Sequence, residues 1–482
     1  MRSGFLGIDV GTQGLKGVII DPAGESFWQA VSPYPTQTPR PGWNEQYPQD
    51  WQRALENVLE QAASAPARIL AIGLTGQMHT SVFCDGAGSP LRPAILWSDN
   101  RGADKVRDLF DTYGEKELWQ RFGNLPLVNY TLIKCLWVRD HEPEIWRQVR
   151  HVAVAKDWLR FIMTGNWGSE VSDASGTYWL SVARRQWAHA WLQELDLPAE
   201  WIGPVAESTV VVGTNRIGPE ALRGIPVVAG AGDQPASALG TGVIAEGTVG
   251  ISLGTSGVVF WPRPRFEPPP HASIHAFCHA LPEHWYWMGV TQAAAYSLTW
   301  LHERFGPTAT FDAWTDEAAT APPGSDGLLF LPYLNGERAP INDPDARGVW
   351  FGLSSAHRRS HLIRSVLEGV ALSLKDVVET MQALATPHRL VATGGGVKSA
   401  LWAQILCDAL GSPIDVVEDP GAAVGAARLA QLSQDSAAGE RLRPTVAWTA
   451  EPEPSAVTVY QSAFARYRKL YQTVRPLWAS QS

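Results

Sequence analysis

The feature that most constrains the fold is an eight-residue pattern that occurs twice, about half a chain apart. One copy is GIDVGTQG at residues 7–14, and the other is GISLGTSG at residues 250–257. Each copy is followed by an apolar run, so each predicts a strand, a tight glycine turn and a second strand. A duplicated core fold explains two such copies in 482 residues. We therefore expect two related domains, residues 1–243 and 244–482.

Between and after these copies, strand patterns alternate with helix patterns, which is typical of an α/β fold with parallel strands. Strands are predicted at 69–74, 225–229, 390–393 and 414–417, and helices at 400–410 and 422–432. Several of these strands run into glycine-rich turns, which places ligands at their carboxyl ends. An extended loop is predicted at 262–270, a surface segment at 433–455, and a terminal helix around Tyr460 and Tyr467 that docks on its own domain.

Composition excludes several classes of protein. The formal net charge of -9 disfavours a nucleic-acid-binding face, which is usually basic. No apolar run approaches the roughly 20 residues that span a bilayer. The four cysteines are far apart and form no C-x-x-C pair, which disfavours a zinc ribbon or a disulfide scaffold. These features predict a cytoplasmic protein that binds neither membrane nor nucleic acid.

The chain contains no G-x-x-x-x-G-K-[ST] loop, so a nucleotide phosphate would need another cradle. The two glycine hairpins can provide one, because glycine lets successive backbone N–H groups point at an anion. Thr12 and Thr255 would add hydroxyl donors from the two domains. Asp9 stands where the second copy has Ser252. Its carboxylate either binds a cation such as Mg²⁺ or caps its own turn.

Asp233 follows the predicted strand 225–229 and opens the segment QPASAL. Asp is a preferred N-cap residue, and Pro235 suits a first helical turn. Phosphoryl transfer to an alcohol also needs a base that accepts the hydroxyl proton. The residue pattern alone leaves both roles open. The segment TGGGVKS at 393–399 predicts a strand-to-helix turn where a ligand meets bare backbone.

Longer motifs resemble the FGGY family of carbohydrate kinases over nearly the whole chain, and within it most closely the xylulokinases. The matching segments are GIDVGT at 7–12, FLPYLNGER at 330–338, GVWFGL at 348–353, and the following HL and SVLE at 361–368. The resemblance implies an actin-like ATPase fold: two ribonuclease-H-like α/β domains that close on ATP and a sugar in an inter-domain cleft. It implies ATP-dependent phosphorylation of D-xylulose to D-xylulose 5-phosphate, with ATP and Mg²⁺ as cofactors.

The resemblance also assigns roles to residues, with Asp233 as the catalytic base and Asp9 as a catalytic residue that holds the metal. The sugar is expected to contact Asp233 and the residues Met78, His79, Trp97, Asp99 and Gln234. The nucleotide is expected to contact Thr12, Gln13, Gly254, Thr255, Gly395, Gly396 and Ser399. A homodimer is a further expectation.

Three alternatives remain at this point. The substrate could be ribulose, another pentulose or a glycerol-like polyol, because Gln234 replaces the Asn that many xylulokinases carry after the base. An actin-like ATPase that only switches conformation is disfavoured by the sugar-kinase segments. A sugar-sensing repressor is expected to carry a helix-turn-helix, whereas the first strand is predicted here from Phe5.

Overall fold

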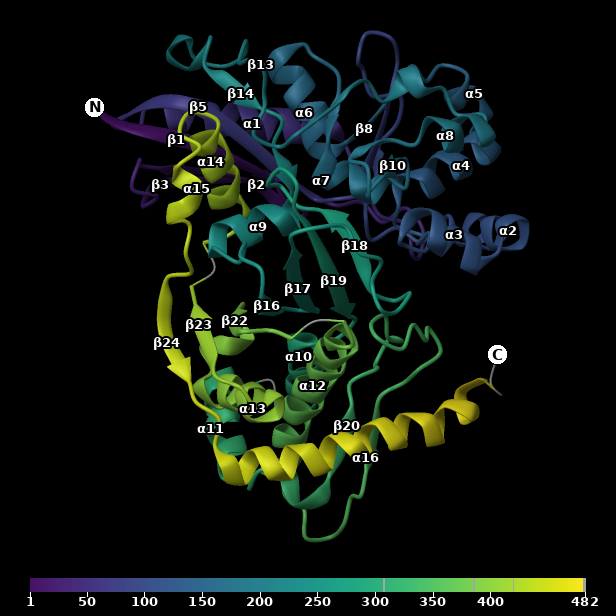
Figure 1. Cartoon of the computed structure of the whole chain (residues 1–482), viewed down its shortest axis with the longest axis vertical. Coiled ribbons are helices and arrows are strands. Elements are labelled where there is room, and N and C mark those ends of the chain that lie inside the picture. Colours follow the sequence, from purple (N-terminus) through teal and green to yellow (C-terminus); the bar gives the residue numbers. More distant parts are fainter. Residues whose placement is uncertain (307, 385, 419, 480–482) are drawn as a thin grey trace.

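The computed structural model describes residues 1–306, 308–384, 386–418 and 420–479, and these form two α/β lobes (Figure 1). Each lobe is built on a mixed seven-stranded sheet. The first sheet has the order β13-β14-β5-β1-β2-β3, with β15 paired to β5. Its strands are β1 (Arg2–Val10), β2 (Gly14–Ile20), β3 (Ser26–Pro33), β5 (Ala67–Gly76), β13 (Val211–Thr214), β14 (Pro226–Val228) and β15 (Ala231–Gly232).

The second sheet has the order β18-β19-β17-β16-β22-β23-β24. Its strands are β16 (Thr248–Leu253), β17 (Gly257–Arg263), β18 (His275–Cys278), β19 (Trp285–Thr291), β22 (Arg389–Thr393), β23 (Ile414–Val417) and β24 (Val446–Ala450). The two copies of the repeat occupy equivalent places in the two sheets. β1 pairs antiparallel with β2 and parallel with β5, just as β16 pairs antiparallel with β17 and parallel with β22. The predicted pair of hairpins is therefore confirmed.

Several predicted elements have the expected bounds, namely β23, α13 (Ala400–Leu410) and α14 (Ala422–Leu432). The tail forms α16 (Pro454–Ala479), and its Tyr460 and Tyr467 are buried in the core of the second lobe. The hydroxyl of Tyr467 donates a hydrogen bond to that of Tyr333 at 2.7 Å. The helix therefore docks on its own lobe, as predicted.

Two predictions of irregular structure are wrong in part. The expected loop at 262–270 starts later, because β17 continues to Arg263, with Pro262 opposite Tyr286 of β19. The expected surface segment at 433–455 contains α15 (Ala438–Arg441) and the strand β24. Among the described residues, β24 pairs only with β23 at the sheet edge and exposes most of its residues. The strand is only five residues long and stands in a segment rich in Ser, Ala, Glu and Pro, which concealed it.

Helix α14 belongs to the second half of the chain but packs against the sheet of the first lobe, beside β1 and β5 (Figure 1). Two glycines permit this approach. A Cβ atom at Gly7 would overlap the carbonyl oxygen of Ala423, and one at Gly73 would overlap that of Ala426. On its other side α14 packs against α9 (Asp233–Thr241). The chain therefore returns to the first lobe before it finishes the second.

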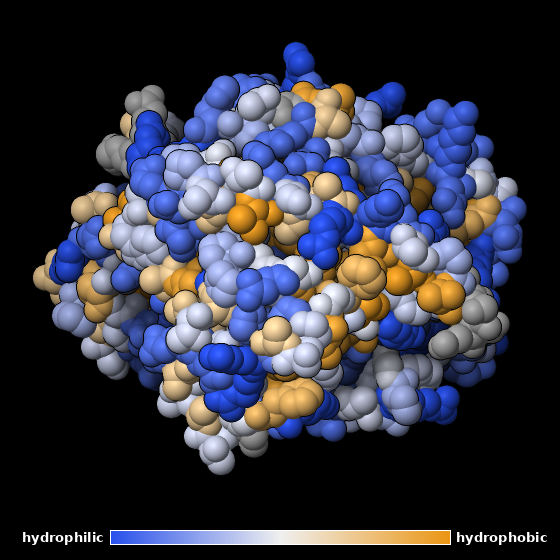
Figure 2. All heavy atoms as spheres, turned by 90° about the horizontal axis from the view of Figure 1, so that it is seen from below, coloured by the Kyte–Doolittle hydropathy of each residue, from blue (hydrophilic) through white to orange (hydrophobic). Residues whose placement is uncertain are grey.

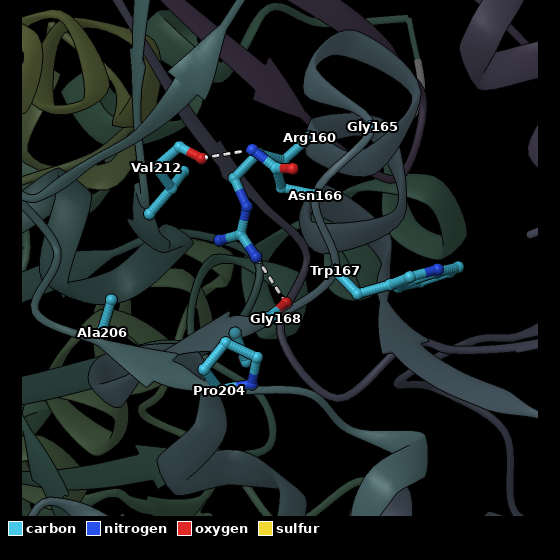
Figure 3. Close-up of a pocket in the computed structure, with 9 residues that line it drawn as sticks. Arg160, Gly165, Asn166, Trp167, Gly168, Pro204, Ala206 and Val212 are labelled. Carbon is cyan, nitrogen blue, oxygen red and sulfur yellow. Dashed lines mark hydrogen bonds between the residues drawn. The ribbon is translucent and has the colours of Figure 1, made fainter.

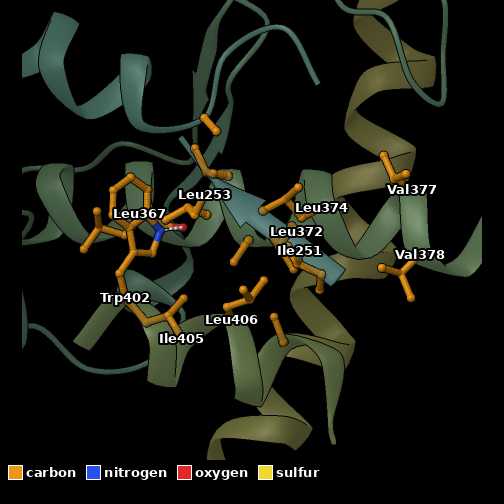
Figure 4. Close-up of a cluster of buried hydrophobic side chains, with 14 of the residues drawn as sticks. Ile251, Leu253, Leu367, Leu372, Leu374, Val377, Val378, Trp402, Ile405 and Leu406 are labelled. Carbon is orange, nitrogen blue, oxygen red and sulfur yellow. Dashed lines mark hydrogen bonds between the residues drawn. The ribbon is translucent and has the colours of Figure 1, made fainter. Parts of the chain in front are cut away.

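The glycine hairpin at residues 250–257 packs against a hydrophobic core (Figure 4). Ile251 and Leu253 of β16 contact side chains of α12 (Arg359–Gln382) and α13, with Trp402 among them. The indole N–H of Trp402 donates to the carbonyl oxygen of Leu367 at 3.0 Å. Because this core is close-packed, it holds the end of β16 in a fixed position.

The outer surface gives no sign of a membrane span. Seen from below, apolar side chains lie among polar ones (Figure 2). Across the described ranges, every helix is too short or too polar to cross a bilayer.

Candidate active site

The carboxyl ends of β1, β5 and β15 bring the two predicted carboxylates together. Asp9 pairs with Thr75 of β5, and Gly232, which precedes Asp233, pairs with Gly76 of the same strand. The pKa of Asp233 is raised to about 7, first by burial and then by the negative charge of Asp9. Such a pKa suits a group that must take up a proton near neutral pH.

Asp233 is the first residue of α9, and Gly232 occupies the N-cap position. The N-cap interpretation of Asp233 is therefore wrong. Its carboxylate accepts hydrogen bonds from the backbone N–H and the side chain of Gln234, which lower its pKa in part. The carboxylate lies at the amino end of α9, where the helix dipole favours negative charge.

Asp9 is half-buried, and its buried Oδ1 atom has no hydrogen-bond partner among the described residues. Burial raises the pKa of Asp9 to about 6, and Lys16, opposite it in the β1–β2 hairpin, lowers that pKa in part. A carboxylate oxygen without a donor fits a hard cation such as Mg²⁺. Among the described residues, no group of three His, Cys, Asp or Glu side chains is placed to hold a metal ion. A cation at Asp9 would therefore need further oxygen ligands from a bound phosphate or from water.

The predicted sugar turn directly follows β5. Met78 lies against Gly232, where a Cβ atom would approach the Met78 Sδ atom to 2.9 Å. His79 has a left-handed backbone (φ 67°), and its Nδ1 lies 2.8 Å from the carbonyl oxygen of Gly176. Burial lowers the pKa of His79 to about 3, so the ring is neutral at pH 7. The structure thus brings Met78 and His79 close to Asp233.

Trp97 and Asp99, which are also predicted to contact the sugar, have different surroundings. Trp97 is 40% exposed, and its indole N–H donates to the Thr12 hydroxyl at 3.1 Å. This hydrogen bond links the segment predicted to bind the sugar to the glycine hairpin at residues 7–14. Asp99 is buried and accepts from the backbone N–H of Asn44 at 2.7 Å and from the Arg101 guanidinium at 2.8 and 2.9 Å. Its position is structural, and its contact with sugar stays a prediction.

The predicted nucleotide residues lie in three turns. Thr12 and Gln13 lie between β1 and β2, and Gly254 and Thr255 lie between β16 and β17. Gly395 has open space where a Cβ would stand, whereas Gly396 packs tightly on the side chain of Leu253. The Ser399 hydroxyl accepts from the backbone N–H of Trp402 at 3.3 Å and caps α13. Sequence reasoning did not assign that capping role.

Sequence reasoning also missed a buried ionic cluster behind Asp233. The Lys156 ammonium lies 2.7 Å from Asp157, 3.3 Å from Glu170 and 3.4 Å from Asp173. Ser172 donates to Glu170 at 2.9 Å and accepts from the backbone N–H of Gly232 at 3.1 Å. The cluster therefore fixes the residue that precedes Asp233. Its members are scattered through 156–173 without a motif, so the sequence offered no signal for it.

A hollow of about 420 Å³ lies elsewhere on the first lobe, lined by residues between Arg160 and Val212 (Figure 3). None of the predicted site residues lines it. The Arg160 guanidinium donates there to the backbone carbonyls of Gly168 and Ala229, and it is ion-paired with Asp157 at 2.9 Å. This hollow is therefore separate from the site at the end of β5.

Comparisons with known proteins agree with this geometry. Residues 5–240 match the N-terminal domain, and residues 249–433 the C-terminal domain, of the FGGY family of carbohydrate kinases. The xylulose kinase of Escherichia coli K12 is 36% identical, over 98% of this chain and all of that protein. The xylulose kinase of Bacillus subtilis 168 is 33% identical, over 98% of this chain and 97% of that protein.

Solved structures agree as well. A "xyloylose kinase" from Brucella ovis is 36% identical with a TM-score of 0.93, over 98% of this chain and all of that one. A xylulose kinase from Rhodospirillum rubrum is 27% identical with a TM-score of 0.93, over 99% of this chain and all of that one. The two lobes thus have the actin-like fold that the resemblance implied, and the chain belongs to the FGGY family of carbohydrate kinases.

Proposed function

We propose that this enzyme transfers the terminal phosphoryl group of ATP to the 5-hydroxyl of D-xylulose, giving D-xylulose 5-phosphate. The observation that carries the proposal is the meeting of Asp9, Asp233 and the Met78-His79 turn at the end of β5. The relatives named xylulose kinases, which match nearly the whole chain, support this substrate.

In the proposed mechanism the Thr12 and Thr255 hairpins hold the phosphate chain of ATP from the two lobes. Mg²⁺ bound at Asp9 would supply positive charge that neutralises the phosphates. Asp233 accepts the proton of the 5-hydroxyl while its oxygen attacks the terminal phosphorus atom, and ADP leaves with the electron pair of the broken P–O bond. The neighbouring Met78 and His79 orient the sugar. Closure of the lobes excludes water and limits ATP hydrolysis.

A panel of about ten sugars and polyols, assayed by ATP consumption with purified protein, tests the substrate. We expect the highest kcat/KM for D-xylulose, with a KM in the millimolar range or below. The panel should include ribulose, glycerol and gluconate, since a Bacillus subtilis gluconokinase is 30% identical over 87% of this chain. A higher kcat/KM for another compound would contradict the assignment to D-xylulose. Sugar-independent ATP turnover would favour a conformational ATPase instead.

The pH profile should show that the base works only when ionised. Since the pKa of Asp233 is raised to about 7, kcat/KM for the sugar should rise with pH and then level off. A cation bound beside Asp9 would lower the pKa of the carboxylate pair, so the apparent value should lie between the ordinary 3.8 and about 7. Initial rates at saturating ATP and Mg²⁺ measure it. Activity that increases as the pH falls through this window would contradict the role.

The domain boundary, the cellular location and the oligomeric state belong to the same proposal. We divide the chain between residues 243 and 244, and we place the enzyme in the cytoplasm, where its proposed co-substrate ATP is made.

We also propose a homodimer, since Phe351 and Leu353 expose apolar side chains. Light scattering after gel filtration should give about twice the chain mass of 52.6 kDa. A monomer mass at assay concentration would contradict the dimer.

A further inference from the structure

Arg338 is a cationic side chain without a partner. It lies in the loop between β20 (Leu329–Leu331) and β21 (Val349–Phe351) of the second lobe. Within the described ranges, its guanidinium makes no hydrogen bond and has no carboxylate within ion-pair distance. The residue keeps an accessible edge, yet burial is the main cause that lowers the pKa of its guanidinium. A cation held this way in the absence of ligand points to a ligand that completes it.

The backbone around Arg338 is firmly anchored to the end of β19. The Glu337 carboxylate accepts from the backbone N–H groups of Gln292 at 2.6 Å and of Arg338 at 2.7 Å. The backbone N–H of Ala339 donates to the carbonyl oxygen of Val290 at 3.0 Å. The Glu337 carboxylate accepts from these amides and forms no ion pair with the guanidinium, although its charge raises the pKa of Arg338 in part. This arrangement fixes the base of the Arg338 side chain without a direct charged contact to its guanidinium.

The Arg338 loop lies beside the sugar end of the site. The Ser273 hydroxyl donates to the carbonyl oxygen of Pro340 at 2.9 Å, which places this loop next to His275 of β18. The rings there form one group, since Tyr130 contacts His275 at 3.3 Å and has its ring centroid 5.0 Å from that of His79. In agreement with this placement, the positive charge of Arg338 is a further cause, after burial, of the lowered pKa of His79 and of His275.

Hydrogen-bond chemistry defines what this end can bind. A carbonyl oxygen only accepts, so the contact with Gly176 makes Nδ1 of His79 the protonated nitrogen. Nε2 of His79 is then an acceptor, while the guanidinium of Arg338 only donates. One acceptor beside one charged donor matches a hydroxyl next to a carbonyl, which is the unreacted end of an open-chain 2-ketose.

We propose that Arg338 recognises the C2 carbonyl of the sugar by donating a hydrogen bond to it, while Nε2 of His79 accepts a hydrogen bond from the adjacent C1 hydroxyl. Arg338 is then a specificity-determining residue that the second lobe contributes to a sugar site otherwise built from the first. This inference rests on the proposed function. It would favour a ketose over the corresponding polyol, because the C2 carbonyl oxygen only accepts, whereas a C2 hydroxyl must turn its hydrogen away from the guanidinium and find another acceptor for it.

The test compares Arg338→Met and Arg338→Lys with wild type. For the Met variant, kcat/KM for D-xylulose should fall by about 10- to 100-fold, the usual range for a lost charged hydrogen bond. The inhibition constant of xylitol, a five-carbon polyol with a hydroxyl at C2, should change by less than about 3-fold. The KM for ATP should not change, and Lys should restore part of the loss. Arg265→Met is the control, since that side chain is 79% exposed in the same lobe.

Each outcome separates this inference from the proposed function. A wild-type enzyme that phosphorylates no ketose would refute the proposed function. A wild type active on D-xylulose, together with an Arg338→Met variant of equal kcat/KM, would refute only the role of Arg338. Equal losses for D-xylulose and for xylitol binding would also refute carbonyl recognition. If the Met variant does not fold, Arg338→Lys carries the same comparison, because it keeps the charge but changes the donor geometry.

Discussion

Replacing Asp233 with asparagine is expected to lower kcat by at least about 100-fold, the usual scale for the loss of a general base. Asparagine keeps the size of the side chain and one oxygen that can accept from Gln234, but it cannot take up the proton of the attacking hydroxyl. Steady-state rates at saturating ATP and D-xylulose measure the effect. The exposed Asp111→Asn on α2 (Ala103–Tyr113) is a matched control and should retain wild-type kcat.

The same substitution should make the protein without ligands more resistant to heat. The folded-state pKa of Asp233 is about 7, above the ordinary 3.8, so folded protein binds the proton more tightly than unfolded protein. Stability from this group is therefore present below pH 3.8 and is lost as the pH rises through 7. At pH 7 the charge on this half-buried carboxylate therefore destabilises the fold. Asparagine removes that charge, so the Tm should rise by a few degrees.

Measuring both kcat and Tm distinguishes loss of the catalytic base from damage to the fold. An inactive variant with a lowered Tm would indicate damage to the fold and would leave no support for the base. An Asp233→Asn enzyme with nearly full kcat would refute the role of Asp233 directly.

Replacing Gly73 with alanine should destabilise the protein by about 3 kcal/mol or more, the upper range for overpacking a close-packed site. The new Cβ would overlap the backbone carbonyl of Ala426 in α14. A backbone atom cannot turn away as a flexible side chain can, so β5 and α14 would have to separate. Thermal unfolding, followed by circular dichroism, should show a Tm several degrees below wild type.

Gly86→Ala provides the matched control for that experiment. Among the described residues, a Cβ atom there would come within 4 Å of the Cγ of Arg150 alone, at an ordinary 3.8 Å. Its Tm should stay close to that of wild type. If Gly73→Ala also melts at the wild-type temperature, the close packing of α14 on the first sheet is wrong.

Local patterns explain what the sequence could predict. The paired hairpins and the elements at 400–410, 414–417 and 422–432 follow from glycine turns and apolar periodicity, which depend on neighbours in the chain. Strand β24 was missed because a short edge strand that buries only its last residue shows no alternation of buried and exposed positions. The packing of α14 on the first lobe was missed because nothing in an apolar helix states which sheet it covers.

The candidate site divides in the same way. Asp9 lies near the carboxyl end of β1, while Asp233, Met78 and His79 follow strand ends, and the structure places these ends together. The cluster around Lys156 could not be predicted, since it depends on distant segments that meet in space. Arg338 stood inside a recognised segment, but only the structure reveals that its charge lacks a partner.

The return of α14 to the first lobe has a consequence for how the enzyme opens. The polypeptide passes from one lobe to the other three times: after α9, between β23 and α14, and again between α15 and β24. Three separate connections restrict the relative rotation and translation of the lobes more than a single linker would. A substitution that loosens α14 from the first sheet should therefore also loosen one of the connections between the lobes.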